Sequence, residues 1–435
     1  MRCLSVAEGK TDQAWGLILD DNPQILRAIH EDGFYVIEAS AIKEYREPRL
    51  MTKFDTSVNV AKPLKDRGID VLPNTRHSYV LGTFNLYEPF PDMTGIRPLP
   101  ISLPDFETLC IDGLTSEANA INALIASRTL EEFLDEEWLI ETFNGRMGTN
   151  DFVFDVEVAD GGFLTIDVHA AQLEIDGGFE SERSVVILEA KNVIHNDFNV
   201  RQFYFPYRKY LNMVRKPIRL VFSQYTNLTY YLHEYEFWDP SNFSSIQHIR
   251  TQAYTFEDVA ISWSDLRETW ERTAVETDDN QATAPIQFIQ ADRFEIVLAL
   301  LERVKAEGGD MLASDVAEFI GYVPRQAAYY PSAGQYLGLF DRSERGHVKL
   351  TPLAEAILDF RYRDRQLAYV ALMFKHEIFH RLFGIAFRSG TMPEKSDVIE
   401  VMLELNVCNN GATVVRRATT VISWLNWIMA LPEDD

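Results

Sequence analysis

The sequence contains no long apolar run, few cysteines and a deficit of positive charge, and each absence excludes a class of protein. No stretch of 18 consecutive apolar residues occurs among the 435 residues, so no transmembrane helix is expected. The first residues, MRCLSVAEGKTDQ, lack the apolar centre of a signal peptide. Cys3, Cys110 and Cys408 lie far apart without CxxC spacing, which predicts reduced thiols in a cytoplasmic protein.

Several catalytic signatures are also missing. No Walker A, GxGxxG or GxSxG sequence occurs, so the chain has no motif for a phosphate-binding loop or a serine hydrolase. Lys and Arg number 41 against 66 Asp and Glu, a net charge of −25 that repels nucleic acid at long range. The segment from Phe198 to His233 differs, because it has no acidic residue. It carries six basic ones: Arg201, Arg208, Lys209, Arg215, Lys216 and Arg219.

The stretch AQLEIDGGFESERSVVILEAKN, residues 171–192, carries the strongest chemical pattern. Asp176 ends an alternating run, and an apolar strand then leads to Glu189 and Lys191. Side chains of a strand alternate between faces, so Glu189 and Lys191 point the same way, opposite Ala190. If the two strands pair, two carboxylates and an ammonium converge, which suits Mg²⁺ and a lysine that positions a water. The alternative is an edge hairpin with solvated charges.

The surrounding pattern predicts an α/β core of mixed sheet flanked by helices. A helix is expected from Ser116 to about Phe143 and a second over 195–211, interrupted or ended near Pro206. The expected strands are 150–158, 163–169, 172–176, 185–189, 218–223 and 228–237, with turns at 160–162 and 177–178.

This order and these motifs resemble the PD-(D/E)xK nuclease superfamily over roughly residues 116–240, and more narrowly its type II restriction endonucleases. The segment DFNVRQFYFPYR (197–208) is similar to that following the ExK strand in some restriction enzymes. Ile175 stands where the superfamily motif has proline.

The resemblance implies a Mg²⁺-dependent enzyme that cleaves double-stranded DNA, works as a homodimer and is paired with a DNA methyltransferase. It implies that Asp176, Glu189 and the Ala190 carbonyl bind the metal and that Lys191 positions the attacking water. Glu117 is the candidate for a further acidic residue, with Glu137 and Glu141 as competitors. Arg201 or Gln202 would orient the site or the phosphate, and Arg208 and Lys209 would contact DNA.

Two further domains are expected around a nuclease domain at 113–270. Residues 1–112 form a mixed accessory unit, in which the strands 34–37 and 79–84 stand out and the segment 47–55 is either a DNA arm or a solvated loop. After a polar linker at 271–285, residues 286–435 resemble a winged-helix domain with added helices. Ser314 would cap a short helix, and the helix 325–337 would enter a major groove. The residues expected to contact DNA are Arg325, Gln326, Tyr329, Arg342 and Arg345.

A rival motif is His376-Glu377-Ile-Phe-His380, which matches the HExxH of zinc peptidases, with Glu400 as a third ligand. The charged Arg381 after the second histidine argues against that interpretation. A third hypothesis is a non-catalytic winged-helix regulator that binds DNA without cleaving it.

Overall fold

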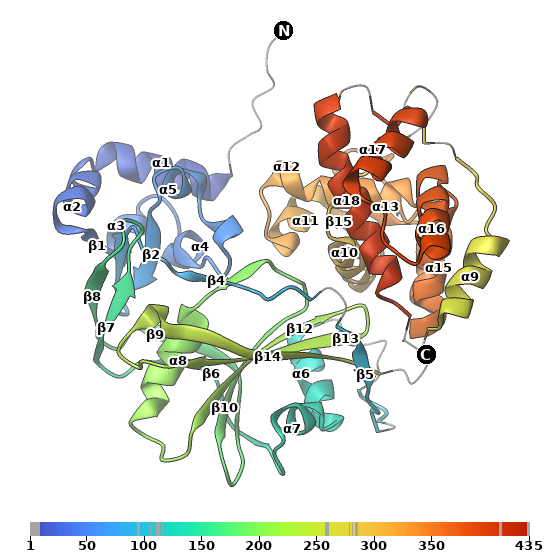
Figure 1. Ribbon diagram of the computed structural model, residues 1–435. Coiled ribbons are helices and arrows are strands. Elements are labelled where there is room, and N and C mark those ends of the chain that lie inside the picture. Colours follow the sequence, from blue (N-terminus) through green and yellow to red (C-terminus); the bar gives the residue numbers. More distant parts are fainter. Residues whose placement is uncertain are drawn as a thin grey trace.

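The structure, a computed structural model, consists of three units arranged around one large sheet (Figure 1). It describes residues 9–93, 96–104, 106–109, 114, 116–256, 261–277, 279–280, 282, 286–408 and 411–432. The predicted α/β class is confirmed at this level, since the fold has a mixed seven-stranded sheet and a helical C-terminal region. Within the described residues, no helix is both long and apolar enough to cross a membrane.

The N-terminal unit packs short helices on a three-stranded antiparallel sheet of order β1-β3-β2. Its elements are α1 (Lys10–Asp21), α2 (Gln24–Asp32), β1 (Phe34–Glu38), α3 (Ala39–Lys43), α4 (Pro48–Thr52), η1 (Ser57–Asn59), α5 (Lys62–Lys65), β2 (Asp70–Pro73) and β3 (Ser78–Gly82). Both strands expected in this unit are present and pair with each other. Trp15 is fully buried, and its Nε1 donates to the Met51 carbonyl at 2.8 Å, which fixes α4 against α1.

The central sheet has the strand order β5-β14-β13-β12-β10-β9-β6. The strands are β5 (Pro98–Pro100), β6 (Ile140–Gly148), β9 (Gln172–Glu180), β10 (Val185–Lys191), β12 (Ile218–Thr226), β13 (Thr229–Phe237) and β14 (Ile246–Thr255). β10 is antiparallel to β9 and parallel to β12, so the chain needs a crossover, which helix α8 (Arg201–Leu211) supplies. Helix α8 begins later than predicted because β11 (Asp197–Asn199) first pairs with β4 (Tyr87–Pro89), and Pro206 lies inside it.

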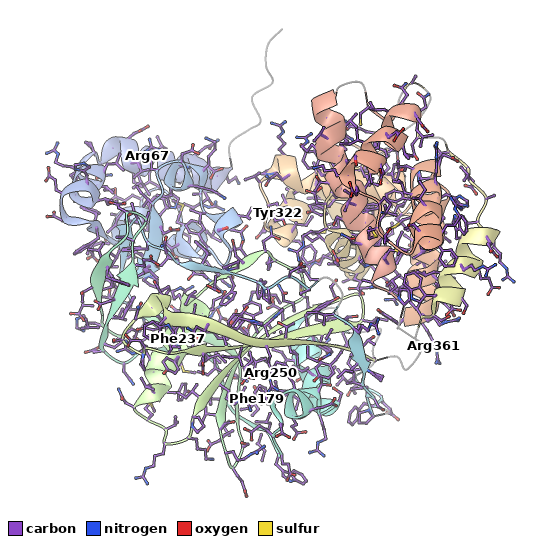
Figure 2. All side chains as sticks on the ribbon, viewed as in Figure 1. Arg67, Phe179, Phe237, Arg250, Tyr322 and Arg361 are labelled. Carbon is purple, nitrogen blue, oxygen red and sulfur yellow. The ribbon has the colours of Figure 1, made fainter. Side chains whose placement is uncertain are left out.

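Helices cover both faces of this sheet, and side chains fill the space between (Figure 2). On one face, Ile187 and Phe222 pack in a core with Phe203 of α8. On the other, Val186 and Leu188 pack with α6 (Glu117–Ala126) and α7 (Thr129–Leu134). A strand buried on both faces is an unbroken apolar run, as the sequence of β10 is.

The helix predicted from Ser116 to about Phe143 is shorter than expected. Ser116 is its N-cap, accepting a hydrogen bond from Asn119 N at 3.1 Å, but α7 ends at Leu134. Asp135 and Trp138 then adopt positive φ of 52° and 57°, which a right-handed helix cannot contain. The residues that follow form strand β6.

Two glycines continue β9, although the sequence suggested that they end it. Gly177 pairs with Leu188, and Gly178 pairs with Ile187. A Cβ at Gly178 would lie 2.2 Å from Cδ2 of Phe143, so glycine makes room for that ring. The absence of a side chain serves close packing here and not a turn.

The predicted hairpin around residues 160–162 forms, but it leaves the central sheet. Its strands, β7 (Phe152–Glu157) and β8 (Phe163–Val168), make a separate two-stranded sheet. Two isolated bridges join this hairpin to the N-terminal part of the chain: Thr75, after β2, bridges to His169, and Phe84, after β3, bridges to Val158. The expected place beside β9 is taken by β6.

The C-terminal unit combines helices with a three-stranded sheet of order β15-β17-β16. Its elements are α9 (Trp263–Arg272), α10 (Phe294–Ala306), β15 (Asp310–Leu312), α11 (Ala313–Ile320), α12 (Pro324–Ala327), α13 (Tyr329–Tyr336), β16 (Phe340–Asp341), β17 (His347–Leu350), α14 (Pro352–Leu358), α15 (Tyr362–Phe374), α16 (Glu377–Ser389), α17 (Lys395–Glu404) and α18 (Gly411–Met429).

Three details of this unit differ from expectation. Ser314 does not cap α11, because the helix already begins at Ala313. The predicted helix 325–337 is divided at Ala328 into α12 and α13. The predicted linker is partly packed: Asp279 is 3% exposed and accepts hydrogen bonds from His376 and Tyr336.

Candidate active site

Charged side chains converge where β9 and β10 lie side by side. Lys191 Nζ lies 2.7 Å from Glu189 Oε1 and 3.7 Å from Asp176 Oδ2. The same ammonium donates to the Ala190 carbonyl at 3.0 Å. The convergence expected from strand alternation is therefore confirmed, since one paired edge brings two carboxylates to one lysine.

The register of the two strands produces this arrangement. The pairing of β10 with β9 ends at Leu188 and Gly177, so Glu189 and Asp176 are the first residues beyond it on the two strands. The backbone N–H of Ala190 donates to Asp176 Oδ2 at 3.0 Å, which fixes that carboxylate across the strand end.

Helices add two more groups to the cluster. Glu117, the first residue of α6, places Oε1 3.9 Å from Lys191 Nζ. The two other glutamates considered for this role do not lie on a helix, because Glu137 follows the end of α7 and Glu141 lies in β6. Gln202, near the start of α8, donates from Nε2 to Oε1 of Glu189.

The cluster has more carboxylates than ammonium groups. Burial, with help from Asp176, outweighs Lys191 and raises the pKa of Glu189 to about 8. Burial lowers the pKa of Lys191, but the carboxylates around it outweigh that effect, so the pKa lies well above its ordinary value. Lys191 is therefore a charged hydrogen-bond donor at neutral pH, and the carboxyl groups around it would also favour a bound cation.

Sequence reasoning missed Asp55 and gave no defined role to His195. Asp55 belongs to the N-terminal unit and raises the pKa of Lys191, while Lys53 lies 3.5 Å from its Oδ2. Burial, with the charge of Lys191, lowers the pKa of His195 to about 4, so its imidazole is neutral at pH 7. The segment 47–55 was noticed only for its basic residues, and no local pattern connects Asp55 to a strand end so far along the chain.

The oxygen atoms of this cluster fit a hard divalent cation. The carboxylates of Asp176 and Glu189 and the carbonyl of Ala190 are the ligand type that Mg²⁺ prefers. Two buried oxygens nearby, Oδ1 of Asp55 and Oε1 of Gln202, have no hydrogen-bond partner among the residues that the structure describes. In the described part of the chain, no three His, Cys, Asp or Glu side chains form a metal centre by themselves, and the Lys191 ammonium lies between the carboxylates.

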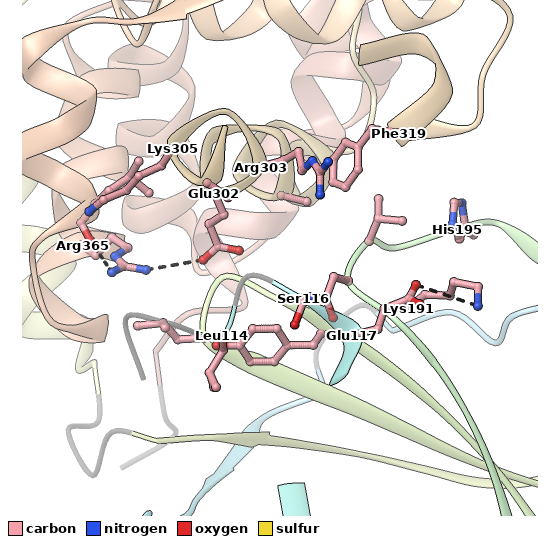
Figure 3. Close-up of a pocket in the computed structure, with 17 residues that line it drawn as sticks. Leu114, Ser116, Glu117, Lys191, His195, Glu302, Arg303, Lys305, Phe319 and Arg365 are labelled. Atoms are coloured by element: carbon pink, nitrogen blue, oxygen red, sulfur yellow. Dashed lines mark hydrogen bonds and ion pairs between the residues drawn. The ribbon is translucent and has the colours of Figure 1, made fainter. Parts of the chain in front are cut away.

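The cluster opens into a cavity of about 610 Å³ between the central sheet and the C-terminal unit (Figure 3). Glu117, Lys191 and His195 line one side, and Arg303 of α10 and Arg365 of α15 line the other. The volume is in the range of small-ligand pockets, roughly 300–1,000 Å³. A substrate group placed there would reach Lys191 and Glu117 directly, with Glu189 and Asp176 behind the lysine.

Comparisons with known proteins identify three families without a known activity. A domain of unknown function (DUF6996) matches residues 12–81, a second (DUF6997) matches 82–255 and a third (DUF7226) matches 296–433. No curated protein and no solved structure matches the chain. The charged cluster lies mainly within the second match, and Asp55 lies within the first.

The residues expected to contact DNA lie in several places. Arg201 and Gln202 are beside the cluster, whereas Arg208 and Lys209 donate to backbone carbonyls of Val153 and Gly148, away from it. In the C-terminal unit, Arg325, Gln326 and Arg345 are exposed and Tyr329 is half-buried, while Arg342 donates to Ser332.

The HExxH motif does not form a zinc site. His376 precedes α16, its Nδ1 lies 2.7 Å from Asp279 Oδ1, and its Nε2 lies 3.2 Å from the Tyr336 carbonyl. Both ring nitrogens are therefore engaged, and neither is left to bind zinc. His380 instead packs its ring against Trp270, with centroids 5.4 Å apart. This arrangement does not favour the peptidase alternative.

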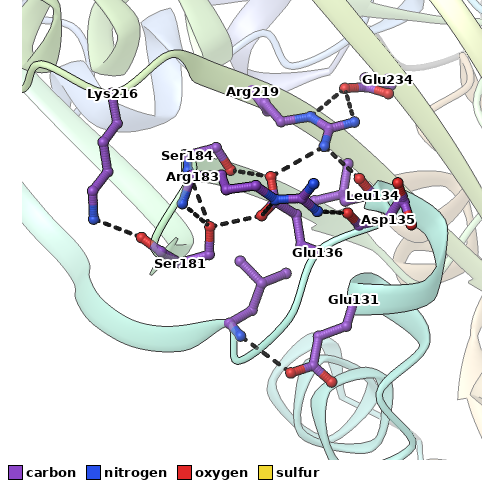
Figure 4. Close-up of polar contacts among 11 residues, drawn as sticks. Glu131, Leu134, Asp135, Glu136, Ser181, Arg183, Ser184, Lys216, Arg219 and Glu234 are labelled. Atoms are coloured by element: carbon purple, nitrogen blue, oxygen red, sulfur yellow. Dashed lines mark hydrogen bonds and ion pairs between the residues drawn. The ribbon is translucent and has the colours of Figure 1, made fainter.

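A second polar cluster, around Glu136, is densely hydrogen-bonded (Figure 4) and lines a cavity of about 440 Å³. Ser181 and Ser184 donate to its carboxylate at 2.7 and 2.8 Å, and Arg183 and Arg219 lie within 3.4 Å. This network anchors the segment after α7 to the sheet.

Proposed function

We propose that the protein is a Mg²⁺-dependent endonuclease that hydrolyses phosphodiester bonds of double-stranded DNA at specific sequences, with a PD-(D/E)xK core. The observation that carries the proposal is the meeting of Asp176, Glu189 and Lys191, with Gln202 on Glu189, at the edge of a nucleotide-sized cavity. Buried carboxyl groups with raised pKa values, Glu189 and Glu117, adjoin a lysine that lines a cavity, and such a combination is more typical of functional sites than of structural ion pairs.

Each residue has a part in the proposed reaction. Asp176, Glu189 and the Ala190 carbonyl would hold Mg²⁺, which when bound neutralises phosphate charge and acidifies water. Lys191, fixed by Glu189 and the Ala190 carbonyl, would donate hydrogen bonds to the attacking water or to the phosphate. Gln202 orients Glu189, and Glu117 is placed to accept a hydrogen bond from a water in the cavity.

The remaining parts of the proposal concern partners. The C-terminal unit, with its three-stranded sheet and α10, α11 and α13, is proposed to be a winged helix that contacts DNA. Double-strand cleavage favours a homodimer, because one cluster cuts one strand. A type II restriction role would pair the enzyme with a methyltransferase in the cytoplasm.

A non-catalytic DNA-binding regulator is the second candidate. It is favoured by one observation, the close contact of Lys191 with Glu189 at 2.7 Å, which a purely structural ion pair would also show. The two candidates differ in whether a phosphodiester bond is broken.

The experiment is digestion of unmethylated, adenine-methylated and cytosine-methylated plasmid with Mg²⁺ or EDTA. Wild-type protein is compared with Lys191→Ala and with the matched control Lys216→Ala, whose lysine pairs with Glu180 elsewhere. Discrete Mg²⁺-dependent fragments from wild type and the control, but not from Lys191→Ala, support the nuclease. Intact DNA on every substrate, with binding retained, supports the regulator.

A further inference from the structure

A second cavity, of about 410 Å³, lies where the three units meet. Its lining includes Lys65 of the N-terminal unit, Asn196 of the central unit and residues of α12, α13 and α18. Figure 2 places Tyr322, another lining residue, on the side of the C-terminal unit that faces the other two. A cavity of this size accepts one small ligand and is too small for a duplex.

This cavity is strongly cationic within an acidic protein. Lys65, Arg293, Arg416 and Arg417 line it, against the single carboxylate of Asp292. That carboxylate is engaged, because it accepts a hydrogen bond from Thr420 at 2.5 Å. An anionic ligand is therefore the complement that the cavity lacks.

Arg417 is the second, independent observation. It is 6% exposed, and within the described ranges its buried Nε has no hydrogen-bond partner. One guanidinium nitrogen, Nη1, donates to the backbone carbonyls of Phe288 and Ile289, and among the described residues no carboxylate pairs with Arg417. A buried cation without a counter-ion is costly, and a bound anion removes that cost.

Aromatic rings provide a second kind of recognition. Tyr329 and Tyr330 line the cavity with Tyr322, whose ring centroid lies 5.7 Å from that of Tyr330. Tyr329 is half-buried and lines the same cavity as Arg417, so the cavity offers both an aromatic ring and a guanidinium group. Planar bases stack on such rings, and guanidinium groups bind phosphate in bidentate fashion.

The two cavities are neighbours. His195 lines the cavity of the Lys191 cluster, and the next residue, Asn196, lines this one. Asn196 is held from both sides, because Arg293 donates to its Oδ1 and its Nδ2 lies 3.2 Å from the Tyr322 hydroxyl. A polynucleotide that reaches Lys191 is therefore within a short span of this second cavity.

We propose that this cavity binds a single nucleotide, with its phosphate at Arg416 and Arg417 and its base against Tyr329. Gln326, which lines the cavity, offers an amide to the edge of the base. The nucleotide is either free or a unit of a DNA strand displaced from its stack. The DNA source rests on the proposed function, whereas binding of a free nucleotide does not.

The test uses the full chain with Lys191→Ala in EDTA, so that no cleavage occurs. Calorimetry measures binding of a deoxynucleoside 5′-monophosphate, the matching nucleoside and inorganic phosphate. We expect the monophosphate to bind about tenfold or more tightly than either fragment, since only it meets both the rings and the guanidinium groups. Inorganic phosphate binding as tightly as the nucleotide would contradict the stacking part, and no binding of any probe would overturn the proposal.

Variants separate recognition from folding. Arg416→Gln and Tyr329→Leu each weaken nucleotide binding by about fivefold or more. Tyr329→Phe, which keeps the ring, and Arg272→Gln, an exposed residue of α9 outside the cavity, bind as the parent does. Arg416 is exposed, so its replacement leaves the fold intact, as the melting temperature checks. Unchanged binding in Arg416→Gln would overturn the phosphate placement.

A competition experiment distinguishes the two sources. If the nucleotide is a unit of DNA, the monophosphate weakens binding of a labelled short duplex in proportion to its occupancy. If it is free, duplex affinity stays unchanged while the monophosphate binds. A protein that neither binds nor cuts duplex but still binds the monophosphate contradicts the nuclease and leaves the nucleotide site standing.

Discussion

Gln202 on α8 donates a hydrogen bond to the same oxygen of Glu189 that accepts one from Lys191 at 2.7 Å. The crossover helix therefore holds the carboxylate from one side while the lysine holds it from the other. Gln202 and Glu189 are 13 positions apart in the sequence, and their contact links the first turn of α8 to β10.

The first prediction concerns that contact. Gln202→Ala should lower the rate of DNA cleavage about 10- to 100-fold while DNA affinity stays within about twofold, because the amide orients a proposed metal ligand. Gln335→Ala, a half-buried glutamine of α13, is the control. Single-turnover cleavage and a filter-binding titration check the two parts; equal losses of binding and cleavage would mean that Gln202 holds DNA instead.

The second prediction concerns Mg²⁺ without DNA. Millimolar Mg²⁺ should raise the melting temperature of wild-type protein by roughly 2–4 °C, because a ligand that binds only the folded state stabilises it. Asp176→Ala should abolish this shift, and Asp66→Asn, an exposed carboxylate of the N-terminal unit, should keep it. Differential scanning fluorimetry with Mg²⁺ and Ca²⁺ measures it. A shift that persists in Asp176→Ala would place the cation elsewhere.

The third prediction concerns the hydrogen-bonded network of Glu136. Its side chain is 4% exposed, and Glu136→Ala leaves two serines without their acceptor and removes the carboxylate that Arg183 and Arg219 share. We expect a loss of about 3–5 kcal/mol in the free energy of unfolding, against less than about 0.5 kcal/mol for the adjacent exposed Glu137→Ala. Urea denaturation gives both values.

The pH dependence of this loss follows from the pKa. Burial raises the pKa of Glu136, but the hydrogen bonds from Ser181 and Ser184 outweigh it, so the pKa lies below its ordinary value. The stabilisation is therefore present above the unfolded pKa, about 4.3, and is lost as pH falls through the folded pKa. A difference between wild type and Glu136→Ala that grows at acidic pH would contradict this sign.

The fourth prediction concerns Asp70, the first residue of β2. Burial raises the pKa of Asp70 to about 7, with Lys65 opposing, so its charged form is disfavoured in the folded protein. Stability contributed by the neutral acid is present below the unfolded pKa, about 3.9, and is lost as pH rises through 7. Asp70→Asn should therefore stabilise the protein by about 1–3 kcal/mol at pH 8 and leave it unchanged near pH 4. Thermal melts at both values measure it, and an equal gain at both would exclude titration as the cause.

Much of the site could be predicted because it lies on one strand pair. Alternation along β10 sets Glu189 and Lys191 on one face. An antiparallel partner strand that carries Asp176 beside them adds the second carboxylate. Gly177 and Gly178 were misread because their role depends on Phe143, a contact between distant segments that no local pattern records.

Other parts could not be predicted for similar reasons. Strand β14 and the pairing of β5 with it depend on which edges remain open once β12 and β13 have paired. Asp55 is brought to the cluster by the packing of one unit on another. The histidines of HExxH have the spacing of zinc ligands. However, Nδ1 of His376 is hydrogen-bonded to Asp279, which belongs to a segment expected to be a linker.

The position of Asp55 restricts how the chain can be rearranged. Because one carboxylate of the cluster comes from the N-terminal unit and the rest from the central one, a central unit isolated by truncation or transplanted beside a foreign partner has a different charge balance around Lys191. The two units must therefore be inherited, exchanged and engineered together, although separate family models match them.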